Sequence, residues 1–461
     1  MNMLNVFNPA TGEHLTQLPI DDADSVLDKT RKAQRAQVAW AATPLQTRMD
    51  CIARFRGLVV GELDDLAKIM TQETGKPISH SRNELNGFLG RIDFFLAEAQ
   101  TALKIETVFD QEGMCEQIER VPLGVIGNIS AWNYPWFVGG NVFVPGLLMG
   151  NAVLYKPSEL AAMTGLAMGR LLHAAGIPQD VFATLIGSAQ TGQALLDQPL
   201  DGMFFTGSLA TGQAIAQVMG PRMTKLQLEL GGKDPTYVCA DADPVAAAQS
   251  LADGAMYNAG QSCCSVERIY VHASIHDRFV DALVETVRTF KMGDPMAADT
   301  YLGPLTRASQ LSVLEEQVAD AKAKGARCLL GGQRSAGPFG GKGNWFEATV
   351  FDQVDHSMLL MRDESFGPII GIQKVQDDLE AIGLMNDTRY GLTAGVYTPN
   401  EKRAREILSK VRAGSVYWNC CDRVSPRLPW SGWGQSGVGL TLSREGLTTF
   451  TRPKAWHLRS N

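Results

Sequence analysis

The chain has 461 residues, of which 45% are hydrophobic and 20% are charged, so its composition is that of a globular protein and excludes a disordered or fibrous one. Its 42 lysines and arginines against 49 aspartates and glutamates give a formal net charge of -7, and no basic run is long enough to follow a nucleic-acid backbone. Nucleic acid is therefore not expected as a partner, and the length predicts two or three domains.

The N-terminal sequence and the cysteines predict a cytoplasmic protein. The first residues contain no basic segment followed by an apolar stretch, so we expect neither a signal peptide nor a transit peptide. The eight cysteines are few for this length and show no CxxC spacing, which argues against a disulfide framework and against a structural zinc site. We therefore expect reduced thiols, a cytoplasmic location and no metal.

Residues 121–155 contain no charged side chain and are long enough to cross a membrane. Prolines, asparagines and glycines interrupt this segment, and its apolar runs are typical of a strand over 125–129, a helix over about 136–148 and a second strand over 152–155. We interpret the segment as a buried β-α-β unit, so no membrane partner is expected.

Strand and helix patterns alternate through most of the chain. Apolar residues recur at helical spacing over 279–287, 311–321 and 404–411, and short strand-like runs cover 236–239, 268–271, 369–373 and 415–418. This alternation predicts open, mostly parallel α/β sheets, and the length predicts at least two of them.

The run Phe204-Phe205-Thr206-Gly207-Ser208, followed by a helical pattern over 213–218, is the first strand-turn-helix signal with chemical content. Glycine at the end of a strand lets the next helix present free backbone N–H groups to a phosphate, but the same glycine is common where a helix packs on a sheet. The residues alone leave both interpretations open and favour packing. A GxGxxG match at residues 432–437 lacks a strand before it and a helix after it, so we do not interpret it as a dinucleotide-binding motif.

Cys263 and Glu229 are the two side chains whose surroundings point to catalysis. Cys263 lies among small and flexible residues that can expose a thiol to a substrate, although an arbitrary cysteine of this kind is more often a buried small hydrophobe. Glu229 stands alone in an apolar strand-like run that ends in two glycines. A buried carboxylate with a raised pKa can serve as a general base, and a surface-facing strand position is an equally good alternative.

Six motifs follow one another along the chain. They are Trp132-Asn133-Tyr134-Pro135, Lys156-Pro157-Ser158-Glu159, Phe205-Thr206-Gly207-Ser208, Leu228-Glu229-Leu230-Gly231-Gly232, Gly260-Gln261-Ser262-Cys263 and Glu364-Ser365-Phe366-Gly367-Pro368. In this order and spacing, essentially the whole chain resembles the aldehyde dehydrogenase superfamily.

The resemblance implies an α/β fold with two doubly wound parallel-sheet domains and a small β oligomerisation element. It assigns residues 1–103 and 123–231 to an NAD(P)-binding domain and residues 232–434 to a catalytic domain that bears the nucleophilic cysteine. Residues 104–122 and 435–461 form the bridging and oligomerisation element.

The resemblance further implies NAD(P)-dependent oxidation of an aldehyde to the free carboxylic acid, without transfer to coenzyme A. Cys263 is then the nucleophile, and its attack gives a thiohemiacetal whose oxyanion accepts hydrogen bonds from the Asn133 amide and the Cys263 backbone N–H. Loss of a hydride leaves a thioester, and Glu229 activates the water that hydrolyses it. Cys264 resembles the variable neighbour of the nucleophile, for which a packing or pocket-lining role is expected.

The cofactor contacts also come from the resemblance. It assigns Trp132, Lys156, Ser158 and Glu159 to the adenosine ribose, Gly187 to the adenine, Gly207 and Ser208 to the pyrophosphate, Glu364 and Phe366 to the nicotinamide ribose and ring, and Gly231 to the same set. The Glu159 carboxylate suits the ribose hydroxyls of NAD and repels the 2′-phosphate of NADP, so NAD is predicted; NADP is the alternative, because Lys156 can attract that phosphate. From the residues alone, Lys156 and Glu159 are typical of an exposed turn.

The sequence indicates much less about the identity of the substrate. Tyr134, Phe137, Val424 and Trp430 occupy positions that line the aldehyde tunnel in the family, which predicts an apolar or aromatic pocket. Arg423, in the same loop as Arg427, can clamp the carboxylate of a semialdehyde, but we favour surface or subunit-interface ion pairs for both arginines. A quaternary ammonium is disfavoured because Asn141 stands where a further aromatic ring would help. A semialdehyde and an aromatic or apolar aldehyde both stay open.

Two other classes of protein are weighed against this prediction. A cofactor-free cysteine hydrolase or acyltransferase could use Cys263 and Glu229, but no histidine lies in a comparably distinctive loop. A catalytically silent scaffold is disfavoured because no catalytic position is substituted. His272 and His276 are interpreted as surface histidines rather than metal ligands. We therefore expect an enzyme whose partner is a small aldehyde and which assembles as a homodimer or homotetramer.

Overall fold

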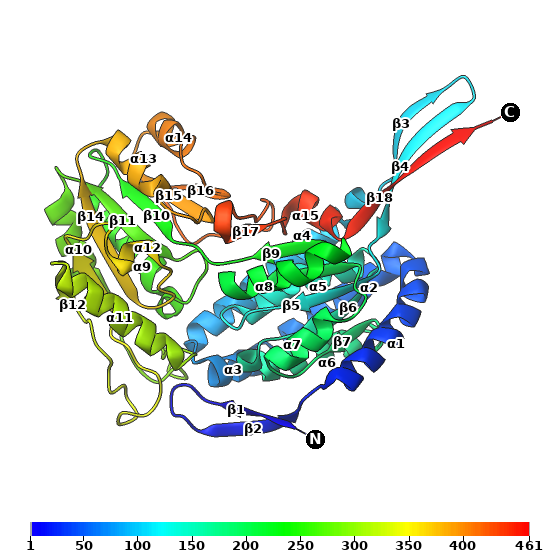
Figure 1. Ribbon diagram of the computed structural model, residues 1–461, viewed down its shortest axis with the longest axis horizontal. Coiled ribbons are helices and arrows are strands. Elements are labelled where there is room, and N and C mark those ends of the chain that lie inside the picture. The colour runs from blue at the N-terminus through cyan, green and yellow to red at the C-terminus, as the bar shows by residue number, and fades with distance from the viewer. Residues whose placement is uncertain (1, 461) are drawn as a thin grey trace.

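The computed structural model describes residues 2–460, and helices and strands alternate along most of the chain (Figure 1). An antiparallel hairpin of β1 (Met3–Phe7) and β2 (His14–Pro19) comes first. Two large sheets follow, and helices cover both faces of each. A third, narrow sheet projects from the body of the molecule.

The first large sheet has six strands in the order β17-β9-β8-β5-β6-β7. Its strands are β5 (Val125–Ile129), β6 (Ala152–Lys156), β7 (Phe182–Thr184), β8 (Gly202–Thr206), β9 (Lys225–Glu229) and β17 (Gly437–Val438). All neighbours are parallel except β17, which runs antiparallel to β9. Because both faces are buried, Val125 packs in the core of one face and Ile126 in that of the other, and the strands are continuous apolar runs.

Two groups of helices cover this sheet. The core on one face includes side chains of α1 (Ala23–Ala42), α7 (Ala189–Leu196) and α8 (Leu209–Met219). The core on the other face includes side chains of α2 (Leu45–Gly61), α3 (Leu63–Thr74), α4 (Ile78–Ala102), α5 (Pro135–Leu148) and α6 (Ala162–Ala174). The uncharged segment 121–155 is thus the predicted unit β5-α5-β6. Within residues 2–460, no helix combines the length and the hydropathy needed to span a membrane.

The second large sheet has seven strands in the order β12-β13-β14-β11-β10-β15-β16. They are β10 (Asp234–Val238), β11 (Val266–His272), β12 (Arg327–Leu330), β13 (Thr349–Asp352), β14 (Ile369–Val375), β15 (Thr393–Tyr397) and β16 (Ser415–Trp418). Only the edge pair β12-β13 is antiparallel.

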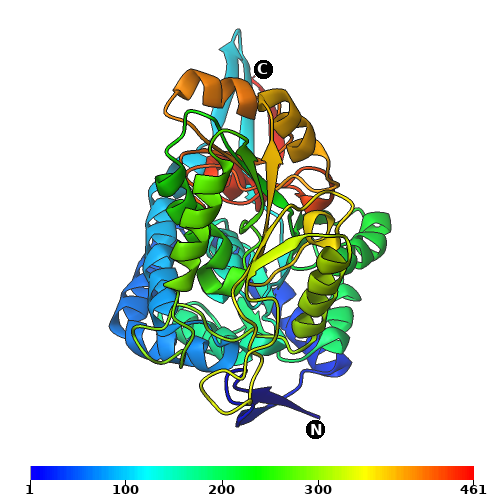
Figure 2. The ribbon, with the colours of Figure 1, turned by 90° about the vertical axis from the view of Figure 1, so that its left-hand side faces the viewer.

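Helices also cover both faces of the second sheet, as Figure 2 shows. The core on one face includes α9 (Pro244–Met256) and α10 (His276–Arg288). The core on the other includes α11 (Ser309–Ala323), α12 (Leu359–Arg362), α13 (Asp378–Asn386) and α14 (Glu401–Leu408). The prediction of two doubly wound, mostly parallel sheets is therefore confirmed.

The third sheet has three antiparallel strands in the order β18-β4-β3 and forms the projecting arm. The strands are β3 (Glu106–Gln111), β4 (Met114–Pro122) and β18 (Thr451–Arg459). The C-terminal residues also supply β17 and the helix α15 (Ser443–Thr449), which packs on α4. Residues 437–459 therefore contribute to two sheets, and the predicted domain limits stay a prediction.

Candidate active site

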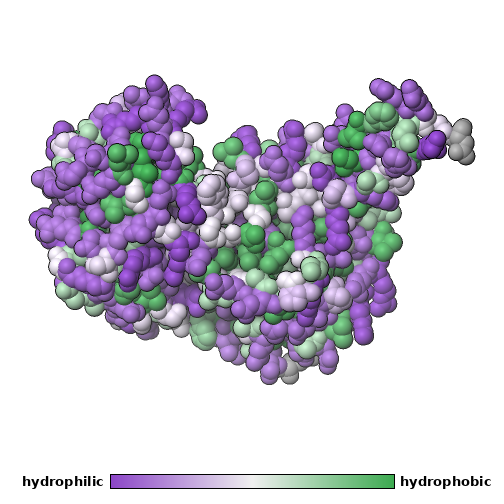
Figure 3. Space-filling view, turned by 45° about the horizontal axis from the view of Figure 1, so that its top comes forward, coloured by the Kyte–Doolittle hydropathy of each residue, from purple (hydrophilic) through white to green (hydrophobic). Residues whose placement is uncertain are grey.

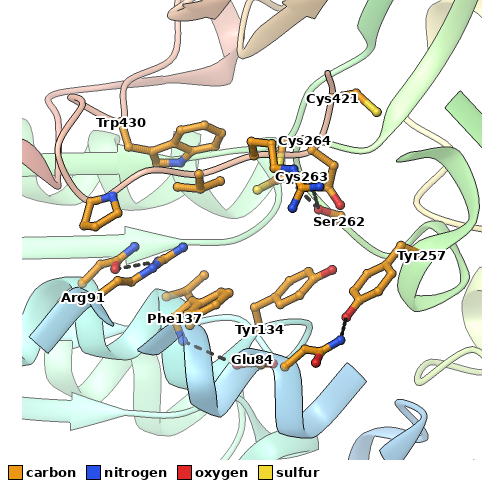
Figure 4. Close-up of a pocket in the computed structure, with 18 of the residues that line it drawn as sticks. Glu84, Arg91, Tyr134, Phe137, Tyr257, Ser262, Cys263, Cys264, Cys421 and Trp430 are labelled. Atoms are coloured by element: carbon orange, nitrogen blue, oxygen red, sulfur yellow. Dashed lines mark hydrogen bonds between the residues drawn. The ribbon is translucent and has the colours of Figure 1, made fainter. Parts of the chain in front are cut away.

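A cavity of about 650 Å³ lies between α4, α5, the loop that contains Cys263 and residues 420–430 (Figure 4). The residues predicted from the sequence that line it are Tyr134, Phe137, Glu229, Cys263, Cys264, Arg423, Val424 and Trp430. Parts of the chain that are far apart in sequence therefore place their predicted catalytic and substrate residues around one cavity.

The Cys263 loop follows α9 and begins with the 3-10 turn η3 (Tyr257–Gly260), in which two residues have left-handed backbone angles. Gly260 itself has a φ of 68°, and a Cβ there would stand 2.1 Å from the carbonyl oxygen of Gly367. Only glycine fits this close approach of two loops. The Cys263 side chain is half-buried and lines the cavity, so a bound molecule can reach its thiol.

Cys264 differs from its neighbour because it is buried. Its Sγ donates a hydrogen bond to Oδ1 of Asp422 over 2.9 Å. A hydrogen bond with Cys263, together with burial, raises the pKa of the Cys264 thiol well above its usual range. Since the thiolate is the nucleophilic form, this raised pKa makes Cys264 a poor nucleophile. Its place in the cavity wall agrees with the expected pocket-lining role.

Asn133 lies directly behind the Cys263 loop and is buried. Its Nδ2 donates to the Gln261 carbonyl over 3.1 Å, and Nδ2 of Asn258 donates to the Asn133 carbonyl over 3.3 Å. These two asparagines join the turn before α5 to the loop that carries the thiol. The Asn133 amide is therefore held next to the backbone of the predicted nucleophile.

Glu229 is the last residue of β9, and its carboxylate is buried in the cavity wall. Oγ1 of Thr441 donates a hydrogen bond to it. Burial raises the pKa of Glu229 to about 7, against the opposing effects of Thr441 and Arg91. The alternative of a surface-facing strand position is wrong, because the segment that carries Thr441 covers the carboxylate. A pKa near neutrality suits a general base.

Glu267, a buried residue of β11, fixes the loop that holds Phe366. Its carboxylate accepts hydrogen bonds from the backbone N–H groups of Ser365 over 2.8 Å and of Phe366 over 3.0 Å, and it pairs with Lys233 over 2.6 Å. The Phe366 ring then meets Trp132 edge to face, with ring centroids 5.6 Å apart. Two residues predicted to bind the cofactor are thus in contact.

Glu364 lies beside the Cys263 loop. Its Oε1 accepts a hydrogen bond from the Gly232 amide over 3.2 Å, and a Cβ at Gly231 would collide with the same carboxylate. A Cβ at Gly232 would stand 3.1 Å from the Cys263 carbonyl oxygen. Burial, with a contribution from Glu267, raises the pKa of Glu364 to about 8. The predicted nicotinamide residues therefore adjoin the predicted nucleophile.

The remaining cofactor residues follow the carboxyl ends of strands in the six-stranded sheet. Lys156 ends β6, Gly187 follows β7, and Gly207 and Ser208 connect β8 to α8. The Ser208 hydroxyl caps α8 by accepting a hydrogen bond from a backbone N–H of the first turn. Ligands of open α/β sheets bind at this edge, and the first N–H groups of a helix suit a phosphate.

Lys156 and Glu159 occupy different environments. Lys156 is buried, which lowers its pKa, whereas the Glu159 side chain at the start of η1 (Glu159–Ala161) is 45% exposed. The ammonium nitrogen lies 3.9 Å from the Glu159 carboxylate, and Ser158 caps the turn between them. The exposed-turn alternative is therefore wrong for Lys156. A carboxylate at a turn, a glycine-serine helix start and an aromatic pair together fit the ribose, pyrophosphate and ring of a nicotinamide dinucleotide.

The sequence analysis missed several residues of the cavity and its supports. Arg91 of α4 is a buried side chain that lines it. Asn141 of α5, which the sequence analysis considered only as a position without an aromatic ring, is also buried in its wall. Glu84 of α4 pairs with Lys76 and accepts a hydrogen bond from the first N–H groups of α5, including Trp136 N over 2.8 Å. A charged residue inside an apolar helical stretch, as at Arg91, was the available signal.

The interpretation of His276 as a surface residue is wrong. His276 is buried, and its Nε2 lies 3.1 Å from Oδ1 of Asp352. The prediction failed because β13, which supplies Asp352, lies far away in sequence. Within residues 2–460 no group of three or more histidine, cysteine, aspartate or glutamate side chains has a metal-binding arrangement.

Comparisons with known proteins agree with this geometry. The chain is 34% identical over 458 residues to a 3,6-anhydro-alpha-L-galactose dehydrogenase of Streptomyces coelicolor, covering 99% of this chain and 93% of that protein. It superimposes on a 3,6-anhydro-L-galactose dehydrogenase in complex with NAP with a TM-score of 0.95 at 31% identity, covering 99% and 96% of the two chains. It superimposes on PnpE in complex with nicotinamide adenine dinucleotide with a TM-score of 0.96 at 29% identity, covering 99% and 94%.

The sequence model of the aldehyde dehydrogenase family matches residues 2–456. This match spans both large sheets, the cavity and nearly all of the projecting arm. The chain therefore belongs to the aldehyde dehydrogenase family, and the predictions of an oxidoreductase and of an NAD(P)-dependent aldehyde dehydrogenase are confirmed.

Proposed function

We propose that the protein oxidises an aldehyde to the free carboxylic acid, with Cys263 as nucleophile, Glu229 as general base and Asn133 as oxyanion donor. The observation that carries this proposal is that one cavity contains both a reachable thiol and a buried carboxylate with a pKa of about 7. Thiol attack and water activation need these two groups within reach of the same bound molecule.

The first half of the reaction takes place on Cys263. Its thiolate attacks the aldehyde carbon, and the carbonyl oxygen becomes the oxyanion of a thiohemiacetal. The Cys263 backbone N–H and the second N–H of the Asn133 amide, whose first N–H bonds the Gln261 carbonyl, are the donors for that oxyanion. When bound, NAD(P) supplies the acceptor for the hydride that leaves the same carbon.

The second half is thioester hydrolysis. The Glu229 carboxylate takes a proton from water, the hydroxide attacks the thioester carbon, and the Cys263 thiolate leaves as the acid forms. Burial explains why this carboxylate holds a proton at neutral pH strongly enough to act as a base yet releases it in the next step.

For the cofactor, we propose that Trp132, Lys156, Ser158, Glu159, Gly187, Gly207, Ser208, Gly231, Glu364 and Phe366 form the binding surface. The exposed Glu159 carboxylate supports NAD over NADP. The buried Lys156, 3.9 Å away, supports a preference of moderate size, because its ammonium partly offsets that carboxylate. The two similar structures with a bound cofactor contain different cofactors: one is a complex with NAP and the other a complex with nicotinamide adenine dinucleotide.

We also propose a cytoplasmic homodimer or homotetramer. All eight cysteines are free, as expected in a reducing compartment. The arm carries exposed apolar side chains among polar ones, which Figure 3 shows as green at its end, and its outer strands leave backbone groups unpaired.

The test is an assay of the purified protein against a panel of aldehydes, followed by absorbance of the reduced cofactor, with NAD and NADP in parallel. The expected result is reduced cofactor with a free acid as the organic product. Acid released from an ester or thioester, with no reduced cofactor formed from any aldehyde, would instead indicate a hydrolase that uses the same thiol.

A further inference from the structure

Arg91 is a buried cation that faces the cavity. The side chain is 4% exposed, its guanidinium carbon lies 3.6 Å from the centroid of the Phe137 ring, and its Nη1 donates to Oδ1 of Asn141 over 2.8 Å. In Figure 4, Arg91 and Phe137 lie across the cavity from Trp430 and Cys263. A guanidinium has five N–H donors. Within residues 2–460, Asn141 is the only protein group that accepts a hydrogen bond from the Arg91 guanidinium.

No carboxylate within residues 2–460 lies within 4 Å of the Arg91 guanidinium. The two acidic side chains that influence its pKa are Glu229 and Glu84, and each has other partners: Thr441 for Glu229, and Lys76 with the start of α5 for Glu84. Burial lowers the pKa of Arg91 to about 10, so it stays charged at neutral pH. Glu229 supplies negative charge near Arg91, but it is hydrogen-bonded to Thr441 and does not contact the guanidinium. A buried guanidinium that no carboxylate contacts is costly, which points to a ligand carboxylate in direct contact with it.

Asn141 presents a second donor at the same place. Because arginine only donates hydrogen bonds, the Asn141 atom that faces Arg91 must be Oδ1, which leaves its Nδ2 group for another partner. Within residues 2–460 that Nδ2 has no protein acceptor, and Asn141 is itself buried in the cavity wall. A guanidinium and an amide N–H side by side form a donor set that matches the two oxygens of a carboxylate.

We propose that Arg91 and Asn141 bind a carboxylate at the end of the substrate remote from the aldehyde, so that the substrate is a semialdehyde. This inference rests on the proposed function, because it assumes that the aldehyde carbon is at Cys263. The Phe137 and Trp430 rings then flank the carbons between the two ends. Hydroxyl groups could satisfy the same N–H donors, but only an anion compensates the charge. Arg423, the clamp considered from the sequence, is exposed at this cavity, where water screens its charge.

The central experiment compares two substrates with the same carbon chain between the aldehyde and the carboxyl group, a semialdehyde and its methyl ester, with wild type, Arg91→Met and Arg423→Met. We expect the wild type to prefer the semialdehyde. Arg91→Met should lower the ratio of kcat/KM for semialdehyde over ester by about 10- to 100-fold, mainly through KM, because charge-assisted hydrogen bonds are lost. Arg423→Met should change this ratio by less than about threefold.

Asn141→Asp is the second variant, and it keeps the size of the side chain. The new carboxylate gives Arg91 an internal partner, so the thermal midpoint should not fall. The Asn141→Asp variant should no longer bind the semialdehyde, because its own carboxylate occupies the Arg91 guanidinium. Succinate or glutarate, used as non-reactive probes, should raise the midpoint of the wild type and leave those of Asn141→Asp and Arg91→Met unchanged.

Four results would overturn the inference. An equal loss of kcat/KM for the semialdehyde and the ester in Arg91→Met would mean that Arg91 acts through Glu229 or through folding. If only Arg423→Met lowered the ratio of kcat/KM for semialdehyde over ester, the carboxylate would bind at Arg423 on the rim of the cavity instead. Oxidation of the ester by the wild type without preference for the semialdehyde would reject the carboxylate and leave the proposed function standing, whereas absence of reduced cofactor with every aldehyde would reject both.

Discussion

At the scale of single residues, the cavity separates the two chemical tasks by environment. Cys263 is half-buried and accessible from the cavity, whereas Glu229 is buried beneath Thr441. A nucleophile needs access to the substrate, and a general base at neutral pH needs a raised pKa. Burial therefore suits one residue and openness the other, although both line the same wall.

Substitution of the two residues should give different kinetic defects. Cys263→Ala should abolish turnover, because no covalent intermediate can form. Glu229→Gln should retain a burst of reduced cofactor and lose steady-state turnover, because thiol attack still proceeds but the thioester is not hydrolysed. Rapid-mixing absorbance measures the burst, and mass spectrometry detects the acyl-enzyme. Full steady-state activity of either variant would refute the assignment of roles.

The raised pKa of Glu229 should also govern the pH dependence. The base acts as a carboxylate, so kcat limited by hydrolysis should rise with pH to a plateau with an apparent pKa of about 7. A carboxyl whose folded pKa exceeds its unfolded value stabilises the fold below the unfolded pKa, and this stabilisation is lost as pH rises through the folded one.

Glu229→Gln should therefore raise the free energy of unfolding relative to the wild type above about pH 8, by up to about 3 kcal/mol, and should change it little near pH 4. Denaturant titration at both pH values measures this difference. Glu159→Gln is the matched control, since it makes the same change at a glutamate whose side chain is 45% exposed. Equal effects at both pH values would mean that the pKa of Glu229 is the same in the folded and the unfolded chain.

At the scale of elements, the ends of strands place the chemistry. Lys156, Gly207 and Glu229 end or follow parallel strands of the six-stranded sheet, so the topology brings them to one edge of it. In the loop after β6, the Lys156 ammonium is buried, whereas the Glu159 carboxylate is exposed at this edge of the sheet.

The exposed position of Glu159 should set the cofactor preference. We expect the wild type to have a higher kcat/KM with NAD than with NADP, and Glu159→Gln to narrow the ratio chiefly by improving NADP, because the repulsion of the 2′-phosphate is removed. The measurement is kcat/KM for both cofactors at saturating aldehyde. A wild-type preference for NADP, or an unchanged ratio, would mean that Glu159 does not contact the ribose.

Elements were readable from the sequence because their signals are local. The strand predicted over 415–418 is β16, and the unit predicted over 125–155 is β5-α5-β6, since apolar runs and breakers report on neighbouring residues. Cys263 and Glu229 were identified through motifs. Arg91 with Asn141 and Glu229 with Thr441 were not, because 50 and 212 residues separate the partners and only the folded chain brings them together.

At the scale of the whole molecule, the active site and the arm are separate structures that share the C-terminal segment. That segment places Thr441 on Glu229, adds β17 to the six-stranded sheet, packs α15 on α4 and ends as the outer strand β18. Assembly through β18 would therefore restrain the same segment that covers Glu229.

The last prediction concerns this outer strand. Trp456 and Leu458 lie two residues apart on one face of β18 and are 37% and 43% exposed. Changing both to lysine should disfavour pairing with another copy, because charge on an exposed edge strand opposes association, and the mass by light scattering should fall from that of an oligomer toward that of one chain. Leu379→Lys on α13, which is more exposed but distant from the arm, is the control and should leave the mass unchanged. An unchanged mass in the double variant, or a monomeric wild type, would show that the arm does not join subunits through this face.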